Sequence, residues 1–301
     1  MRSTQDTMAS NKGKIRVAIL SGKGGTGKTL LSVNLAAAAK ESVYVDCDVE
    51  EPNGALYIKP LNISTEKIYS IIPKVDPKKC TGCRKCVDFC EFNALAHTGD
   101  KLLIFEDVCH SCGGCFLVCP EDALGEKNKE VGEVTIGVSD YVTVISGKLN
   151  IGEASGIPII DYLLENSYTY KDCTFIDCPP GSACPVMESV KDADYCLLVA
   201  EPTIFGVHNL AMVVELVTLL EKPFAVVLNK CLPGSNPSED FCKEHGIPIL
   251  GRIPFDQDIG MINSQGKILA RENPAYEKMF NTILQKIQRE VRNETASHIK
   301  R

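Results

Sequence analysis

Short apolar segments of strand length alternate with longer segments of helical periodicity along most of the chain. The apolar segments cover residues 17–20, 43–45, 142–145, 173–177, 195–200, 224–228 and 247–253. Segments with apolar side chains at helical spacing cover residues 30–40, 157–164, 206–220 and 275–291. Strands that alternate with helices in this way predict an α/β fold, with a mostly parallel sheet covered by helices on both faces.

The alternation is interrupted between residues 75 and 129, where cysteines dominate the pattern. Two sets of four cysteines repeat the spacing CxxCxxCxxxC at a constant offset of 29 residues, which indicates an internal duplication. The sequence therefore predicts an inserted domain at residues 75–129. The surrounding domain is then discontinuous, with residues 14–74 and 130–296, and residues 1–13 form a mobile tail.

The last helical segment carries one apolar stripe. Its members are Phe280, Ile283, Leu284, Ile287 and Val291. Such a stripe packs against a domain or lies on a membrane surface. The polar face of this segment mixes acidic and basic side chains instead of being uniformly basic, which favours packing against the domain.

A glycine-rich loop between the first predicted strand and the first predicted helix has the strongest candidate chemistry. Residues 22–29 fit the phosphate-binding pattern GxxxxGK[ST]. Glycines let backbone amides surround a phosphate, and the following helix N-terminus adds partial positive charge. In a nucleotide site of this kind Lys28 contacts the β and γ phosphates and Thr29 ligates magnesium. The other candidates for phosphate binding are Gly22, Gly24, Gly25, Thr26 and Gly27.

Lys23, directly after the first glycine, distinguishes this loop from an ordinary phosphate loop. With Lys23 the loop resembles the deviant Walker A motif of the MinD, ParA, Mrp and nitrogenase iron protein superfamily. The resemblance implies ATP and Mg²⁺ as cofactors, a homodimer formed on ATP binding, and a Lys23 that crosses to the partner subunit's nucleotide. A chance match in a glycine-rich turn is the alternative, and the flanking strand and helix argue against it.

Acidic residues follow two other predicted strands, at the sheet edge where the phosphate loop is expected. Asp46, Asp48 and Asn53 resemble the superfamily's switch I. That resemblance implies that Asp48 orients the attacking water, with Asp46 and Asn53 in support. A solvated acidic loop is the alternative for this group. Asp177 ends a buried strand and reads as the Walker B aspartate that holds magnesium.

Three more positions are assigned to the nucleotide by the same resemblance. Gly181 follows two prolines in a segment that resembles switch II, where its amide would face the γ phosphate. Asn229 would hydrogen-bond adenine, and the backbone around Pro254 would close the other side of the base. The residues after Asn229 do not complete the NKxD pattern of GTPases, which favours ATP over GTP.

The cysteine spacing matches bacterial ferredoxins, in which the fourth cysteine of each set ligates the opposite cluster. One [4Fe-4S] cluster is accordingly assigned to Cys80, Cys83, Cys86 and Cys119. The other is assigned to Cys109, Cys112, Cys115 and Cys90. Two structural zinc sites are the alternative, because sets of four cysteines also bind zinc. Glu91 departs from the ferredoxin pattern where the second set has Pro120, which leaves the local loop geometry open.

Cys184 lies seven residues after Asp177, the offset at which the nitrogenase iron protein carries a cluster-ligating cysteine. This resemblance makes Cys184 a candidate extra ligand that binds or passes on iron, with Cys178 as its neighbour. The alternative is an ordinary thiol, the commoner role for cysteine.

Composition limits where such a protein works. The chain has 301 residues and a net charge of −7, which argues against a broad nucleic-acid surface. No apolar run approaches the roughly 20 residues that span a bilayer, and the polar start lacks a signal-peptide block. Fifteen cysteines in a long chain favour metal binding in the reducing cytoplasm over disulfides.

Nearly the whole chain thus resembles a MinD-superfamily P-loop ATPase with an inserted two-cluster ferredoxin domain. We expect ATP to close a dimer, hydrolysis to release it, and this change to control electron delivery to a redox partner protein. A maturation factor of the Mrp kind, which assembles or transfers a metallocluster to an accepting protein, is the second hypothesis. A positioning switch of the MinD or ParA kind is the third, and it leaves eight cysteines without a role.

Overall fold

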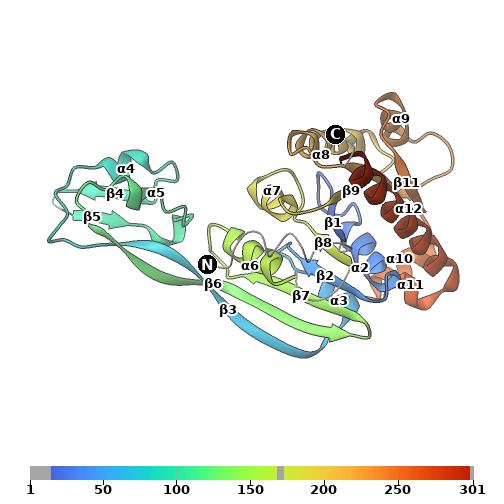
Figure 1. Cartoon of the computed structure of the whole chain (residues 1–301), viewed down its shortest axis with the longest axis horizontal. Coiled ribbons are helices and arrows are strands. Elements are labelled where there is room, and N and C mark those ends of the chain that lie inside the picture. Colours follow the sequence, from blue (N-terminus) through green and yellow to red (C-terminus); the bar gives the residue numbers. More distant parts are fainter. Residues whose placement is uncertain (1–14, 100, 168–172, 299–301) are drawn as a thin grey trace.

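The computed structural model describes residues 15–99, 101–167 and 173–298. The expected tail at residues 1–13 lies outside these ranges. The main body is a nine-stranded sheet with helices on both faces (Figure 1). A smaller module stands apart from this body, at the end of a long two-stranded arm (Figure 1).

Seven neighbouring strands of the sheet run parallel, which confirms the expected α/β fold. Their order is β11 (Ile249–Pro254), β10 (Phe224–Cys231), β9 (Tyr195–Ala200), β1 (Ile15–Leu20), β8 (Cys173–Asp177), β2 (Ser42–Asp46) and β7 (Val142–Leu149). β6 (Leu124–Ser139) pairs antiparallel with β7, and β3 (Leu61–Val75) pairs antiparallel with β6. The phosphate loop and the acidic residues therefore leave the sheet at one edge, where parallel strands end.

The central strands are buried on both faces because their side chains alternate between two apolar cores. In β1, Ala18 and Leu20 belong to one core, and Val17 and Ile19 to the other. The first core is covered by α6 (Ile157–Ser167), α7 (Cys184–Val190), α8 (Ile204–Leu219) and α9 (Pro237–Glu244). The second is covered by α2 (Lys28–Ala38), α3 (Gly54–Ile58), α10 (Gln257–Ser264), α11 (Leu269–Glu272) and α12 (Pro274–His298).

The apolar stripe of α12 packs on the domain. Phe280, Ile283, Leu284 and Ile287 are buried in the second core. Ile283 lies so close to Gly251 of β11 that a side chain at position 251 would collide with it. Within the described ranges, no helix combines the length and the apolar character needed to cross a membrane.

The arm consists of β3 and β6, which are 15 and 16 residues long and pair along most of their length. The pattern of polar and apolar residues does not predict these strands. Most β3 side chains are exposed, so β3 lacks the one-sided burial that produces a regular alternation. The duplicated cysteine segment is therefore attached to the main sheet by continuous strands (Figure 1).

The module at the end of the arm contains α4 (Lys85–Phe89), β4 (Leu95–Thr98), β5 (Lys101–Ile104), η1 (Glu106–Val108) and α5 (Gly114–Leu117). Its internal duplication extends from the sequence to the backbone. Left-handed backbone at Gly82, Arg84 and Asn93 recurs 29 residues later at Ser111, Gly113 and Asp122. Each cysteine set therefore leads through a similar turn into a short helix, α4 or α5.

Candidate functional site

The glycine-rich loop joins β1 to α2 and borders a cavity of about 570 Å³, which we call the nucleotide cavity. From this loop the cavity is lined by Gly24, Gly25, Gly27, Lys28 and Thr29, and from elsewhere by Asp48, Asn53 and Asn229. Gly25 and Gly27 have φ values of 75° and 98°, which non-glycine residues rarely adopt. The cavity is therefore a cradle of backbone and cationic groups, suited to a polyphosphate.

Gly22 and Thr26 shape the loop from behind. A side chain at Gly22 would collide with the backbone of Asn209 in α8. Thr26 is buried, and its hydroxyl lies 3.5 Å from the carbonyl oxygen of Lys23. These two residues fix the path of the loop, whereas the other glycines of the loop, Lys28 and Thr29 form the cavity wall.

Two buried carboxylates lie side by side where β2 and β8 end. Asp46 and Asp177 are paired in the sheet register. The amide of Gly54 donates to Asp46 Oδ2 at 2.9 Å, and the Tyr44 hydroxyl donates to Asp177 Oδ2 at 2.9 Å. Burial raises the pKa of Asp177, and the charge of Lys28 opposes that rise. A cation beside Asp177 would stabilise its ionised form.

Asp177 Oδ1 is buried and has no hydrogen-bond partner among the described residues, so this oxygen is available to a cation. Carboxylate and hydroxyl oxygens are ligands that Mg²⁺ prefers. Asp177 and Thr29, which lines the cavity, therefore fit a magnesium site next to the phosphates.

Asp48 lies between two cavities. It lines the nucleotide cavity and a neighbouring cavity of about 450 Å³, whose wall also includes Glu51, Pro180 and Ala183. Burial raises the pKa of Asp48 to about 6, although the positive charge of Lys28 opposes this. An acid with a pKa near neutrality, beside the phosphate loop, can accept a proton from a positioned water or orient it.

Lys23 is held within its own chain. Its Nζ lies 2.7 Å from Glu201 Oε2, and Lys230 Nζ lies 2.5 Å from Glu201 Oε1. Burial alone would raise the pKa of Glu201, but hydrogen bonds from Lys23 and Lys230 lower it overall. Lys230 also donates to the carbonyl oxygen of Gly25 at 2.8 Å. Glu201 and Lys230 thus brace the outer turn of the loop.

Asn229 reaches the same loop from the end of β10. Its Nδ2 donates to the carbonyl oxygen of Thr26 at 2.7 Å, and its Oδ1 accepts from the Lys230 amide at 2.9 Å. A side chain at Gly27 would collide with this carboxamide. In this structure Asn229 therefore supports the loop and contributes to the cavity wall.

The last two positions assigned to the nucleotide are not part of the described cavity lining. Gly181 donates its amide to the carbonyl oxygen of Ser21 at 2.9 Å, and the adjacent Pro180 lines the cavity. Pro254 ends β11 and lies outside the described lining of the cavity.

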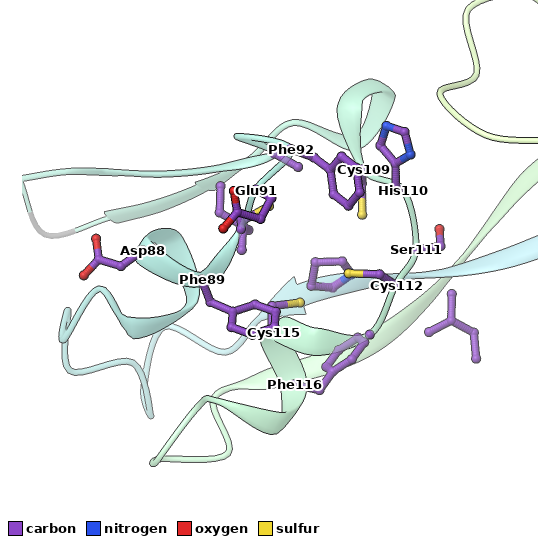
Figure 2. A pocket seen from close by; sticks show the side chains of 16 residues that line it. Asp88, Phe89, Glu91, Phe92, Cys109, His110, Ser111, Cys112, Cys115 and Phe116 are labelled. Carbon is purple, nitrogen blue, oxygen red and sulfur yellow. The ribbon is translucent and has the colours of Figure 1, made fainter. Parts of the chain in front are cut away.

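The eight cysteines of the module surround two separate cavities. The first, of about 430 Å³, is lined by Cys90, Cys109, Cys112 and Cys115, and we call it the Cys109 cavity. Figure 2 shows the sulfur atoms of Cys109, Cys112 and Cys115 turned toward a common space. The second, of about 20 Å³, is lined by Cys80, Cys83, Cys86 and Cys119, and we call it the Cys80 cavity. The structure therefore brings together the two sets of four in the crossed arrangement that the spacing predicts.

The cysteines border these spaces from several sides instead of meeting at one point. Within the described ranges, no three His, Cys, Asp or Glu side chains are grouped as a site for a single metal ion. Burial raises the pKa of Cys86 and Cys109, and that of Cys115 to about 11. A cationic iron centre would lower these values and hold the sulfurs as thiolates. The four sulfur donors around each cavity match the ligand set of an iron-sulfur cluster in number and chemistry.

Cys184 and Cys178 have different environments. Cys184 is exposed and begins α7 directly after Ala183, whereas Cys178 is fully buried next to β8. Burial raises the pKa of Cys178 well above its usual value, which suits a structural thiol. The exposed Cys184 lies on the same side of the sheet as the Asp48 loop, because Ala183 and Asp48 line one cavity.

Sequence reasoning missed two functional candidates at the nucleotide site. Tyr44 hydrogen-bonds Asp177, and its position two residues before Asp46 on a buried strand was the available signal, since such residues share a face. Glu201 directly follows β9, at the edge where parallel strands end, but a single glutamate at a strand end is common. Its partners Lys23 and Lys230 are far from it in sequence, so only the fold identifies the contact.

The comparison with protein-family models matches residues 17–269 to the CobQ/CobB/MinD/ParA nucleotide binding domain. An uncharacterized protein of Methanocaldococcus jannaschii is 31% identical over 282 residues, which cover 91% of this chain and 96% of that protein. An iron-sulfur cluster carrier protein of Pyrococcus horikoshii is 24% identical over 297 residues, covering 92% of this chain and 86% of that protein.

Among solved structures, the septum site-determining protein MinD of Pyrococcus horikoshii, complexed with Mg-ADP, has a similar fold. The TM-score is 0.59 at 16% sequence identity, and the match covers 91% of this chain and 96% of that chain. The nucleotide cavity and the surrounding sheet described above lie within the part of the chain that the family match covers.

Proposed function

Because the chain belongs to the CobQ/CobB/MinD/ParA nucleotide-binding family, we propose that it is a dimeric ATPase switch that controls electron transfer through two [4Fe-4S] clusters. One observation carries this proposal. Two cavities, each lined by four cysteines, lie on an arm whose strands continue the sheet that bears the phosphate loop. A nucleotide site and two cluster sites on one continuous sheet are the parts that such coupling requires.

At the nucleotide site, Lys28 would contact the β and γ phosphates of ATP, and the amides of the glycine-rich loop would surround them. Thr29 and Asp177 would hold Mg²⁺, with Tyr44 keeping Asp177 in position through its hydroxyl. Asp48 lines the same cavity and would orient the attacking water. Hydrolysis would then separate two subunits that ATP had joined.

Lys23 would change partner during this cycle. In the single chain it pairs with Glu201, and its side chain is 38% exposed. A half-exposed lysine at the rim of a phosphate cavity can leave a carboxylate for the stronger charge of a triphosphate in a second copy. The dimer that ATP joins would therefore form at the face that carries Lys23 and Asp48.

In the module, the four sulfurs of each cavity would hold one cluster, which supplies one-electron redox chemistry when bound. The protein contributes the ligand geometry and a partly apolar enclosure. Phe89, Phe92 and Phe116 line the Cys109 cavity and limit water access to it (Figure 2). Such an enclosure influences the reduction potential of the bound group.

A chain of contacts joins the Asp48 loop to the module. The carbonyl oxygen of Val49 accepts from the Leu149 amide at 2.8 Å, and Leu149 leads into the turn that contains Glu153. Glu153 Oε2 lies 2.9 Å from Lys129 Nζ on the arm. A movement of the Asp48 loop can therefore displace Lys129 through Glu153.

Lys129 also holds the segment that precedes Cys109. Its Nζ donates to the carbonyl oxygen of Glu106 at 3.0 Å and to Asp107 Oδ1 at 3.2 Å. Both residues belong to η1, which ends immediately before Cys109. Lys129 is thus the physical connection through which the nucleotide state would reach a cluster ligand.

Anaerobic purification followed by iron, sulfide and zinc analysis tests the cluster assignment. We expect eight irons and eight sulfides per chain, and EPR spectra of the reduced protein that differ between the ATP, ADP and nucleotide-free states. Zinc in place of iron would contradict the cluster assignment. Iron-loaded protein whose EPR spectra are the same in all three nucleotide states would contradict the coupling, but it would agree with the cluster assignment.

The named relatives support a second candidate function, an ATPase that carries a cluster to an accepting protein. The iron-sulfur cluster carrier protein of Pyrococcus horikoshii matches 92% of this chain at 24% identity. Cys83 and Cys112 are exposed, which would permit attack by an acceptor's thiol. Transfer is measured by mixing the iron-loaded protein with an apo-ferredoxin. A carrier loses iron to it in a nucleotide-dependent way, whereas an electron donor keeps its iron.

A further inference from the structure

His97 differs from His110, the other histidine of the module, because one of its ring nitrogens is buried and has no hydrogen-bond partner among the described residues. It lies on β4, and it lines the Cys80 cavity together with Leu102 of the paired strand β5. The buried nitrogen is Nε2. Burying a polar nitrogen without a partner is unfavourable, so a bound group that forms a hydrogen bond with it would remove this cost.

The neighbour that Nε2 faces is a glycine of the cysteine loop. A β-carbon added to Gly82 would lie 3.1 Å from His97 Nε2. Gly82 has a φ of 71° and stands between Cys80 and Cys83, so the loop turns closely around the imidazole. The ring is thereby held against the inner wall of the Cys80 cavity.

We propose that His97 Nε2 donates a hydrogen bond to a sulfur atom of the cluster in the Cys80 cavity and thereby raises its reduction potential. The inference rests on the proposed function, since it requires that the cavity holds an iron-sulfur cluster. A neutral imidazole with its hydrogen on Nε2 supplies the donor, and cluster sulfurs accept hydrogen bonds. Reduction adds negative charge to the cluster, so a donor at its sulfurs stabilises the reduced form more than the oxidised form.

The duplication makes this donor specific to one cluster. The position 29 residues after His97 is Glu126, an exposed acidic residue on β6 that accepts hydrogen bonds when ionised. His110 lines the Cys109 cavity, but its ring is stacked on Phe92 with the ring centroids 3.8 Å apart. The equivalent position of the second repeat therefore lacks this donor, and removal of His97 should change the potential of one cluster alone.

The test is a redox titration followed by EPR on the full-length, anaerobically purified protein, in wild type, His97→Phe and His97→Leu. Both substitutions remove the donor, and phenylalanine keeps an aromatic ring in the space. We expect one of two midpoint potentials to shift downward in the variants and the other to stay in place. His245→Leu, on the C-cap of α9, is the matched control and should leave both potentials unchanged.

Equal potentials in wild type and in an iron-loaded His97 variant would overturn the proposal. If both variants lose half of their iron, pulsed EPR on wild type decides instead. Deuterium exchange and ¹⁵N-histidine labelling should reveal an exchangeable proton and a histidine nitrogen coupled to one reduced cluster. The absence of that coupling would also overturn it. Iron analysis of wild type separates these outcomes from failure of the proposed function, because a chain without clusters fails before any titration begins.

Discussion

Lys23 Nζ lies 2.7 Å from Glu201 Oε2, so the lysine expected to cross to a second subunit is paired inside its own chain. Glu201 is mostly buried and also holds Lys230, which makes it the centre of a three-residue contact. Release of Lys23 must break one of these ion pairs. In the proposed ATP-dependent dimer, Glu201 would therefore set part of the free energy of dimer formation.

Replacing Glu201 with glutamine should strengthen the ATP-dependent dimer, because Lys23 no longer leaves a charged partner. The side chain of Lys23 is 38% exposed, so each pair contributes about 0.5–1 kcal/mol. Because dimer formation releases this pair in both subunits, the dissociation constant should fall roughly five- to thirtyfold. Sedimentation velocity with ATP measures this constant. Glu239→Gln, which removes a surface partner of Arg252, is the control and should not change it. A weaker dimer in Glu201→Gln would show that the pair supports the dimer-competent loop.

Replacing Asp48 with alanine should slow ATP hydrolysis roughly 100-fold or more, because the variant lacks the carboxylate that we propose positions the attacking water. The dimer should still form and should accumulate, since phosphate contacts remain. Steady-state phosphate release and sedimentation velocity measure the two effects. Glu51→Ala is the control because Glu51 lines the same cavities. Normal turnover in Asp48→Ala would remove the catalytic assignment.

Asp48 should also make the nucleotide-free protein less stable as pH rises. Burial raises its pKa in the folded protein to about 6 from 3.8 in the unfolded chain. The folded state therefore binds more protons between these values, so the free energy of unfolding falls as pH increases through about 4 to 6. After allowance for solvent screening at this half-buried site, the loss is about 2 kcal/mol.

The variant Asp48→Asn removes this titration. It should unfold at a higher temperature than wild type at pH 8, and the difference should shrink toward pH 5. Thermal unfolding followed by circular dichroism across this range gives the comparison. A difference between the two proteins that does not depend on pH would contradict the raised pKa.

The parts of the site that the sequence predicts are those set by local rules. Asp46 and Asp177 end buried strands, and the carboxyl ends of parallel strands meet at one edge of the sheet. The sequence therefore predicts that these two carboxylates lie close together, as they do in the structure. The grouping of Cys90 with the second cysteine set is what the resemblance to bacterial ferredoxins implies, and in the structure Cys90 lines the Cys109 cavity. Spacing and strand order carry this information without any knowledge of tertiary contacts.

The parts that the sequence does not predict depend on contacts between distant segments. The arm formed by β3 and β6 has mostly exposed β3 side chains, so no one-sided hydrophobic pattern marks it. Glu201 and His97 belong to no motif. Glu201 matters because it pairs with Lys23, and His97 matters because it lines the Cys80 cavity. Such residues become visible only when the fold brings the two segments together.

Replacing Lys129 with methionine should uncouple the module from the nucleotide site. The side chains of Lys129 and Glu153 are only 14% and 13% exposed, so the loss leaves Glu153 partly buried and unpaired. We expect a stability decrease of roughly 1 kcal/mol and EPR spectra that no longer change with ATP. ATP hydrolysis should continue, because Lys129 does not line the nucleotide cavity.

Lys127→Met is the matched control, since Lys127 lies on the same strand and pairs with Glu106, but makes no described contact with Glu153. Its spectra should keep their response to ATP. A full nucleotide response in Lys129→Met would show that coupling follows another route, such as the strands of the arm themselves.

The crossed assignment of the fourth cysteines predicts how substitutions combine. Cys90→Ser and Cys109→Ser should each remove the same cluster, because both residues line the Cys109 cavity. The double variant should therefore keep about four irons per chain, no fewer than either single variant. Cys90→Ser combined with Cys80→Ser should lose both clusters, since Cys80 lines the other cavity.

Iron analysis of anaerobically purified protein gives the counts. Cys184→Ala is the control for a cysteine outside the module, and it also tests whether Cys184 binds iron. Iron equal to wild type in this variant, with and without ATP, would exclude Cys184 as a ligand. If Cys90→Ser and Cys80→Ser instead removed the same cluster, each set of four would bind its own group, and the crossed arrangement would be wrong.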